Sequence, residues 1–171
     1  MSETAGELIV DGDRATLRFD RWLAHPPATV WAALTEPAQR ARWMGPTVIE
    51  PRVGGHIDMV PTDPPTPEAA KRMTGRITVW DPPHVLEHEW NQRIAEPGYV
   101  RYELHPENAG TRLVLTHRGL GVRNAGGFRP GTHAFLDRLA ALLDGAPLPP
   151  WRHRYRQLAQ TIYHGGEHHD V

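Results

Sequence analysis

The sequence predicts a single α+β domain in which a curved antiparallel sheet of about six or seven strands wraps around one long helix. Between residues 48 and 119, apolar side chains recur at every second position, which is typical of strands with one buried face. Turn sequences rich in Gly, Pro, Asn and Asp separate these runs, as in an antiparallel meander. After Gly131, the apolar spacing changes to that of a helix with one buried side.

Length and composition fit one ordinary globular domain. The chain has 171 residues, of which 39% are hydrophobic and 23% are charged, and it contains no cysteine. The absence of cysteine excludes thiolate catalysis, iron–sulfur clusters and Cys-based zinc sites. The net charge of −1 does not favour a nucleic-acid partner. The aliphatic runs are far shorter than the roughly 20 residues of a membrane span, so no membrane partner is expected either.

The first 13 residues have no basic segment followed by a long apolar run. This pattern lacks the features of a secretion signal. We therefore expect a cytoplasmic protein.

One strand and two short helices are predicted before the meander. Residues 16–23 alternate between apolar and polar side chains and predict the first strand. Two prolines then end the strand and favour a helix over residues 28–34, because proline lacks a backbone donor and fits the first helical turn. Thr35 followed by Pro37 repeats this start signal and predicts a second short helix that ends at Trp43.

Turn sequences locate the strands of the meander. The segments that they precede are residues 56–60, 76–80, 84–90, 99–104 and 111–117. Residues 61–67 (PTDPPTP) are too rich in proline for a central strand. We interpret this segment as a loop that acts as a lid over a pocket.

The C-terminal part predicts a long helix and a shorter added one. In residues 132–144 the apolar side chains fall on one face of a helix. After a stiff connector, residues 151–162 place four large apolar side chains at intervals of four, three and four. Such a stripe is seldom left in water, so we expect this helix to dock on its own domain or on a twin subunit in a homodimer. The expected parts are a domain over residues 1–145, an added helix over 146–164 and a disordered tail over 165–171.

Several motifs are weighed and set aside. His84 and His88 match the H-x-x-E-H string of zinc peptidases, but in a strand they lie about 13 Å apart, too far to share one ion. The histidines of the tail have no fixed geometry. The chain contains no G-x-S-x-G motif, and no G-x-G-x-x-G follows a strand. We expect no metal and no cofactor, and we assign no catalytic residue.

The alternation along the strands predicts which side chains face the concave side of the sheet. Polar residues that share a face with apolar neighbours are candidates for a ligand cavity, although each also fits the role of a satisfied core residue. The candidate ligand-binding residues are Arg21, Trp31, Trp43, Met59, Ile77, His88, Trp90, Tyr102, His117 and Phe135.

Several segments together resemble one protein superfamily. Residues 24–37 (AHPPATVWAALTEP) and 41–46 (ARWMGP), followed in order by 53–56 (VGGH) and 110–113 (GTRL), resemble the SRPBCC superfamily. Within it, the chain looks like the group named for the activator of heat-shock protein 90 ATPase homologues. The resemblance implies a helix-grip fold, similar to START and pollen-allergen-like domains, with a cavity between the sheet and the long helix. Family members often carry an aromatic residue where this chain has His88, which implies a more polar pocket.

Three functions stay open on this basis. The leading hypothesis is non-covalent binding of a small hydrophobic or amphipathic ligand in the cavity. The first alternative, implied by cyclase-like relatives, is an enzyme that uses His88 or His117 as a general acid or base. The second is an interaction protein that contacts a chaperone or another chain through residues 151–162.

Overall fold

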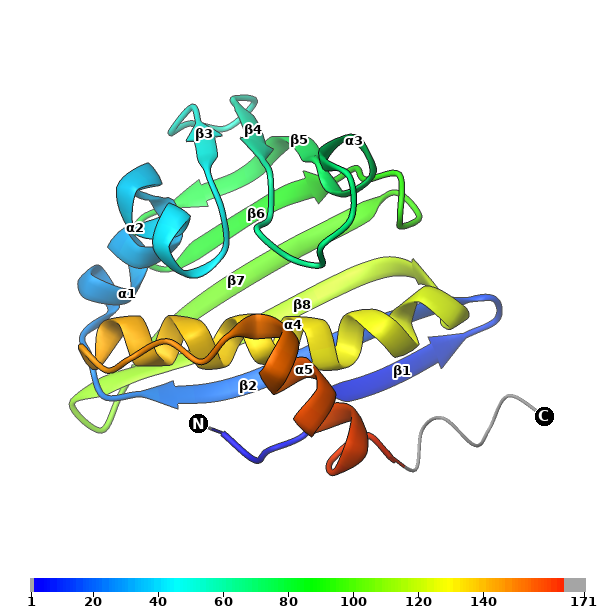
Figure 1. Ribbon diagram of the computed structural model, residues 1–171. Coiled ribbons are helices and arrows are strands. Elements are labelled where there is room, and N and C mark those ends of the chain that lie inside the picture. Colours follow the sequence, from blue (N-terminus) through cyan, green and yellow to red (C-terminus); the bar gives the residue numbers. More distant parts are fainter. Residues whose placement is uncertain (1, 165–171) are drawn as a thin grey trace.

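The computed structural model describes residues 2–164, and these form one antiparallel sheet curved around a long helix (Figure 1). The predicted tail, residues 165–171, lies outside the described residues. Within residues 2–164 the sheet has eight strands, in the order β1-β2-β8-β7-β6-β5-β4-β3. The strands are β1 (Glu7–Asp11), β2 (Arg14–Leu23), β3 (Thr47–Ile49), β4 (His56–Met59), β5 (Met73–Asp81), β6 (Val85–Trp90), β7 (Gly98–Glu107) and β8 (Gly110–Gly121).

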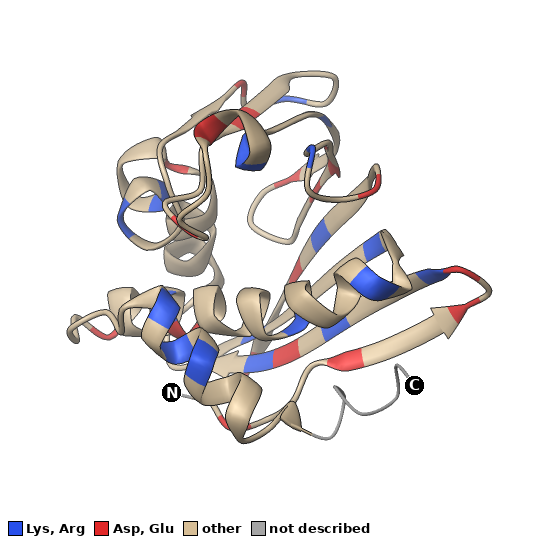
Figure 2. Cartoon of the chain, turned by 45° about the vertical axis from the view of Figure 1, so that its right-hand side comes forward, with Lys and Arg blue, Asp and Glu red and all other residues tan. Residues whose placement is uncertain are grey.

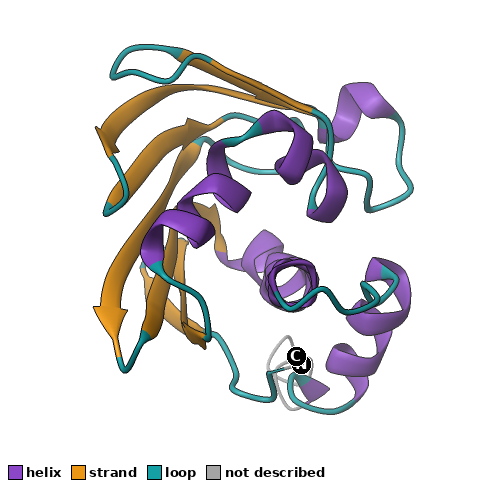
Figure 3. Cartoon of the chain, turned by 90° about the vertical axis from the view of Figure 1, so that its left-hand side faces the viewer, coloured by secondary structure: helices purple, strands orange, loops and turns teal. Residues whose placement is uncertain are grey.

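The helices lie on the concave side and at the ends of the sheet. They are α1 (Pro27–Thr35), α2 (Pro37–Trp43), α3 (Glu68–Lys71), α4 (Val122–Leu143) and α5 (Trp151–Gln160). Viewed along its axis, α4 lies inside the curve of the sheet (Figure 3). The predicted α+β helix-grip architecture is therefore confirmed, including the two short helices after the first long strand.

The alternation along the strands puts one set of side chains under α4. In β2, Leu17 and Phe19 are fully buried, whereas the intervening Arg18 lies at the other face. The register of β6, β7 and β8 aligns His88, Val100 and His117 in one row across the sheet. Paired residues of an antiparallel sheet share a face, so this row belongs to the same concave surface.

The edge strand β1 is absent from the sequence-based prediction. All five of its residues are exposed, so its apolar side chains show no alternation that would reveal a buried face. β1 pairs with β2 through a tight turn at Gly12, whose φ of 62° suits glycine.

Helix α4 begins at Val122 and not after Gly131, where the prediction started it. Its first turns are polar and rich in glycine, so they lack the apolar period of a helix. Tertiary contacts form them instead: the Glu96 carboxylate accepts hydrogen bonds from the Gly121 backbone amide and from the Asn124 side chain. A carboxylate at a helix N-terminus is also favoured by the helix dipole.

Helix α5 packs on α4 at a point where α4 has no side chain. The indole nitrogen of Trp151 donates to the Gly131 carbonyl oxygen at 3.0 Å. A Cβ at position 131 would lie 3.3 Å from the Trp151 ring, so glycine permits this close approach. Next to it, Arg154 of α5 donates to the Asp137 carboxylate at 2.7 Å, with both side chains only 2% exposed.

The same buried network holds the N-terminal segment of the described chain. Arg154 also donates to the Ser2 carbonyl oxygen, and His133 Nε2 donates to that oxygen at 2.8 Å. His133 Nδ1 therefore accepts, and it receives the Tyr163 hydroxyl hydrogen at 2.7 Å. Burial lowers the pKa of His133, which favours this neutral form. The N-terminal segment, α5 and Tyr163 are thereby held against one face of α4 by hydrogen bonds.

We predict that Arg154→Met destabilises the fold by about 3 to 5 kcal/mol, because it leaves the Asp137 carboxylate buried without its cation. The melting temperature should fall by roughly 6 to 20 °C, and a calorimetric scan measures it.

Arg152→Met is the matched control. The basic residues of α5 are blue in Figure 2; Arg152 lies exposed at the start of the helix, whereas Arg154 is buried. If the two variants melt at the same temperature, the buried ion pair does not stabilise the docked helix.

Candidate functional site

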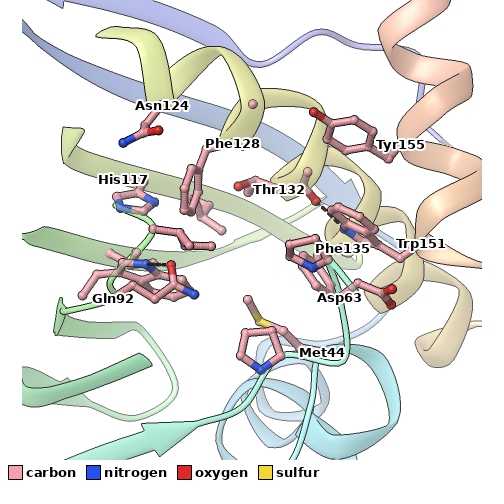
Figure 4. A pocket seen from close by; sticks show the side chains of 18 of the residues that line it. Met44, Asp63, Gln92, His117, Asn124, Phe128, Thr132, Phe135, Trp151 and Tyr155 are labelled. Carbon is pink, nitrogen blue, oxygen red and sulfur yellow. Dashed lines mark hydrogen bonds between the residues drawn. The ribbon is translucent and has the colours of Figure 1, made fainter. Parts of the chain in front are cut away.

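A cavity of about 520 Å³ lies between the concave face of the sheet, the N-terminal half of α4, α5 and the loop that follows β4 (Figure 4). Sites for small molecules in proteins have volumes of about 300 to 1,000 Å³. The cavity is therefore large enough for a small organic ligand.

The sheet supplies the first wall. It consists of Trp90 on β6, Val100 and Tyr102 on β7, and Leu115 and His117 on β8. These residues are neighbours because Val100 pairs with His117 and Tyr102 pairs with Leu115 in the strand register. All five are at most 4% exposed, so the wall is fixed by its own packing.

Helices α4 and α5 supply the opposite wall. Phe128, Thr132 and Phe135 lie on one face of α4 at intervals of four and three residues. Trp151 and Tyr155 of α5 continue this wall, with ring centroids 4.9 Å apart. The result is a largely aromatic surface facing the sheet across the cavity (Figure 4).

The loop after β4 covers a third side. Pro61, Asp63 and Pro64 line the cavity there. The ammonium group of Lys71 donates to the carbonyl oxygens of Thr62 and Pro64, at 3.1 and 2.9 Å, and so ties the loop to α3. The lid function expected for residues 61–67 stays a proposal.

His117 is the most unusual polar group of the wall. Its Nε2 atom is buried without a hydrogen-bond partner among the described residues. Burial, and secondarily the nearby His88, lower the pKa of His117 to about 3. At neutral pH the ring is therefore uncharged, with one nitrogen that can donate and one that can accept a hydrogen bond.

Two hydroxyl groups join His117 at the cavity. Tyr102 and Thr132 both line it, and neither hydroxyl forms a hydrogen bond with any part of the chain that the structure describes. Together, the three side chains offer uncharged donors and acceptors in a largely apolar cavity. This arrangement can orient a ligand that is mostly hydrophobic.

His88 lies behind the wall and does not line the cavity. Its Nδ1 atom is 2.8 Å from the Glu89 carbonyl oxygen, so Nδ1 carries the proton and Nε2 is an acceptor, which has no partner among residues 2–164. Burial lowers the pKa of His88 to about 4. Its ring stacks on Trp90, which in turn packs 5.3 Å from the ring of His117.

Of the ten candidate ligand-binding residues, four line this cavity, namely Trp90, Tyr102, His117 and Phe135. Five others lie in the packed core outside it, and these are Trp31, Trp43, Met59, Ile77 and His88. Trp31 packs edge-on against Trp80, for example, and the Trp43 indole donates to the Ala33 carbonyl oxygen. The alternation of side chains along the strands predicts which residues face the concave side of the sheet. It does not predict which of these residues are covered by helices and which line the cavity.

The tenth candidate, Arg21, borders a separate pocket of about 300 Å³. One of its guanidinium nitrogens lies 3.4 Å from His133 Nδ1, so Arg21 belongs to the network that holds the N-terminal segment. Burial lowers the pKa of Arg21, and the Asp137 carboxylate opposes this effect.

Sequence reasoning missed the wall residues Phe128 and Thr132, because it placed the start of α4 after them. The spacing of Phe128, Thr132 and Phe135 was the signal that could have found them. The H-x-x-E-H string proves to lie in a turn and a strand: His84 is exposed before β6, and His88 is buried within it.

Comparison with known families identifies the domain. The family model of the activator of Hsp90 ATPase homolog 1-like proteins matches residues 24–144. The chain belongs to this family. Domains of this kind generally bind ligands. The matched range ends before α5, so Trp151 and Tyr155 are wall residues outside it.

Solved structures with a similar fold extend over most of the chain. The solution structure of CalU16 from Micromonospora echinospora has a TM-score of 0.70 and 21% identity, and covers 96% of this chain and 98% of that one. The protein encoded by BPP1335 from Bordetella parapertussis has a TM-score of 0.68 and 27% identity, with coverages of 90% and 86%. Protein MLL2253 from Mesorhizobium loti has a TM-score of 0.66 and 24% identity, with coverages of 78% and 99%.

Comparison with curated proteins gave no match. Across residues 2–164, none of the helices combines the length and the apolar character needed to cross a bilayer.

We predict that the free energy of unfolding decreases as the pH falls from about 6.5 towards 4. The unfolded chain takes up protons near pH 6.5, whereas the folded chain resists protonation of His88 and His117 until about pH 4 and 3. Protonation therefore favours the unfolded state, by on the order of 3 kcal/mol for His88. Urea denaturation at a series of pH values measures this slope.

His117→Phe should flatten the slope, because the variant has one fewer buried base. The exposed His56, changed to Gln, is the control and should keep the slope of the original protein. Equal slopes in all three proteins would contradict the prediction.

Proposed function

We propose that this protein binds a small, largely hydrophobic molecule non-covalently in the cavity between the sheet, α4 and α5. The observation that carries the proposal is the composition of the walls: aromatic and aliphatic side chains line about 520 Å³, and one of the lining residues is His117, whose Nε2 atom is buried without a partner among the described residues. A buried polar atom without a partner costs free energy. A ligand that forms a hydrogen bond with this nitrogen of His117 would recover the cost. An apolar residue at position 117 would carry no such cost in the unliganded protein.

The apolar walls supply most of the expected affinity. Removing about 300 Å² of apolar ligand surface from water contributes roughly 7 kcal/mol, before the loss of ligand freedom is subtracted. Hydrogen bonds to Tyr102, His117 or Thr132 then orient the ligand and add selectivity.

The state of the pocket histidine favours binding over acid–base catalysis. A general base works best when its pKa lies near the operating pH. The pKa of His117 lies at about 3, so its neutral ring is a weak base. His88 does not reach the cavity at all. The geometry thus favours a binding protein over an enzyme that relies on either histidine.

We predict that Gly127→Leu reduces the affinity for a neutral apolar probe at least tenfold. Gly127 lines the cavity, and a Cβ there would lie 3.8 Å from the Tyr155 hydroxyl oxygen, in ordinary contact. The leucine side chain therefore occupies ligand space without straining the helix. Saturable fluorescence of N-phenyl-1-naphthylamine measures the binding.

Gly126→Leu is the matched control, because position 126 has the same helical setting but lies in open space outside the cavity. Both variants gain helix propensity, so a difference between them reports on the cavity alone. Absence of saturable probe binding to the folded original protein, or equal affinity in both variants, would contradict the proposal.

A further inference from the structure

Arg40 of α2 lies behind the cavity wall as a fully buried cation. Its side chain is 0% exposed, and its guanidinium group stacks over Trp43 and Tyr102 at 5.3 and 5.9 Å from the ring centroids. Tyr102 is one of the cavity residues, so a single aromatic ring separates this charge from part of the enclosed space.

The hydrogen-bond partners of Arg40 are weak for a buried charge. One nitrogen donates to the Leu34 carbonyl oxygen at 3.0 Å, and a second lies 3.4 and 3.6 Å from the sulfur atoms of Met44 and Met59. The Nε atom has no hydrogen-bond partner in the part of the chain that the structure describes. Within residues 2–164, no carboxylate forms an ion pair with Arg40. A buried charge is normally paired, because its loss of hydration is otherwise uncompensated.

Met44 stands between Arg40 and the cavity. Its sulfur atom contacts the guanidinium group, while the residue also lines the cavity (Figure 4). A thioether is only a weak acceptor, and the unbranched methionine side chain changes rotamer readily. A stronger acceptor can therefore replace the sulfur atom at the guanidinium group when Met44 swings aside.

We propose that Arg40 is the counter-ion for an anionic head group, so that the ligand is an amphipathic carboxylate. The carboxylate displaces the Met44 sulfur atom and pairs with Arg40, and the apolar body extends along Trp90, Phe135 and Trp151. This inference rests on the proposed function and narrows its ligand class. It also accounts for the missing ion pair, since the ligand supplies the negative charge.

A second arginine gives the natural comparison. Arg123 also lines the cavity, but it is exposed at the first turn of α4. An ion pair in water contributes little, so pairing there would give only a weak preference for an acid. The two arginines thus differ in burial: Arg40 is buried behind the cavity wall, whereas Arg123 is exposed to water.

The test is competition against N-phenyl-1-naphthylamine by decanoate and decan-1-ol, which differ only in the head group. At pH 7.5, decanoate should displace the probe at a concentration at least tenfold lower than decan-1-ol. Arg40→Met should abolish this preference, whereas Arg123→Gln should retain it. Equal potency of the two competitors, or loss of the preference only in Arg123→Gln, overturns the inference. Failure of the probe itself to bind overturns the proposed function instead.

A second measurement needs no variant, in case Arg40→Met does not fold. The carboxyl carbon of ¹³C-labelled decanoate reports the ionisation of the bound ligand by NMR between pH 7.5 and 5. Next to Arg40, the bound carboxylate should stay ionised over this range, with a pKa below that of the free acid. In an apolar cavity without a cation, burial would raise the pKa of the ligand. A bound pKa at or above that of the free acid contradicts the role of Arg40.

Discussion

The packing of α4 against the concave face of the sheet is the constraint on which the rest of the structure depends. In its C-terminal half, α4 seals the sheet with the buried side chains of Leu136 and Leu139. In its N-terminal half, Gly127 and Gly131 line the cavity on the side of α5, where they leave space next to Trp151 and Tyr155. One helix therefore both completes the core and leaves a cavity, because the size of its side chains changes along its length.

The segments outside the matched family range complete this arrangement. The N-terminal residues and α5 are joined to α4 through Asp137, His133 and Arg154, which are all buried. A network of this kind is stable only when every member finds a partner. Its effect on the cavity is direct, since it fixes α5 and with it the rings of Trp151 and Tyr155.

The sequence predicted the parts of the fold that depend on local periodicity. Strand alternation placed Trp90, Tyr102 and His117 on the concave face, and the helical period after Gly131 located the sealed half of α4. It failed where distant contacts decide the structure. The first turns of α4 depend on hydrogen bonds to the carboxylate of Glu96. The indole nitrogen of Trp43 donates to the Ala33 carbonyl oxygen of α1, so this side chain lies in the core and not at the cavity.

A short series of hydrogen bonds connects the sheet wall of the cavity to the loop after β4. The Trp90 indole donates to the Gln92 side chain, which donates to the Lys71 carbonyl oxygen, and the Lys71 ammonium group holds two carbonyl oxygens of the loop after β4. Moving that loop away from α3 breaks both hydrogen bonds of the Lys71 ammonium group. Should the loop act as the proposed lid, these bonds would slow the release of a bound molecule, so that residence time and equilibrium affinity would be set by different groups of atoms.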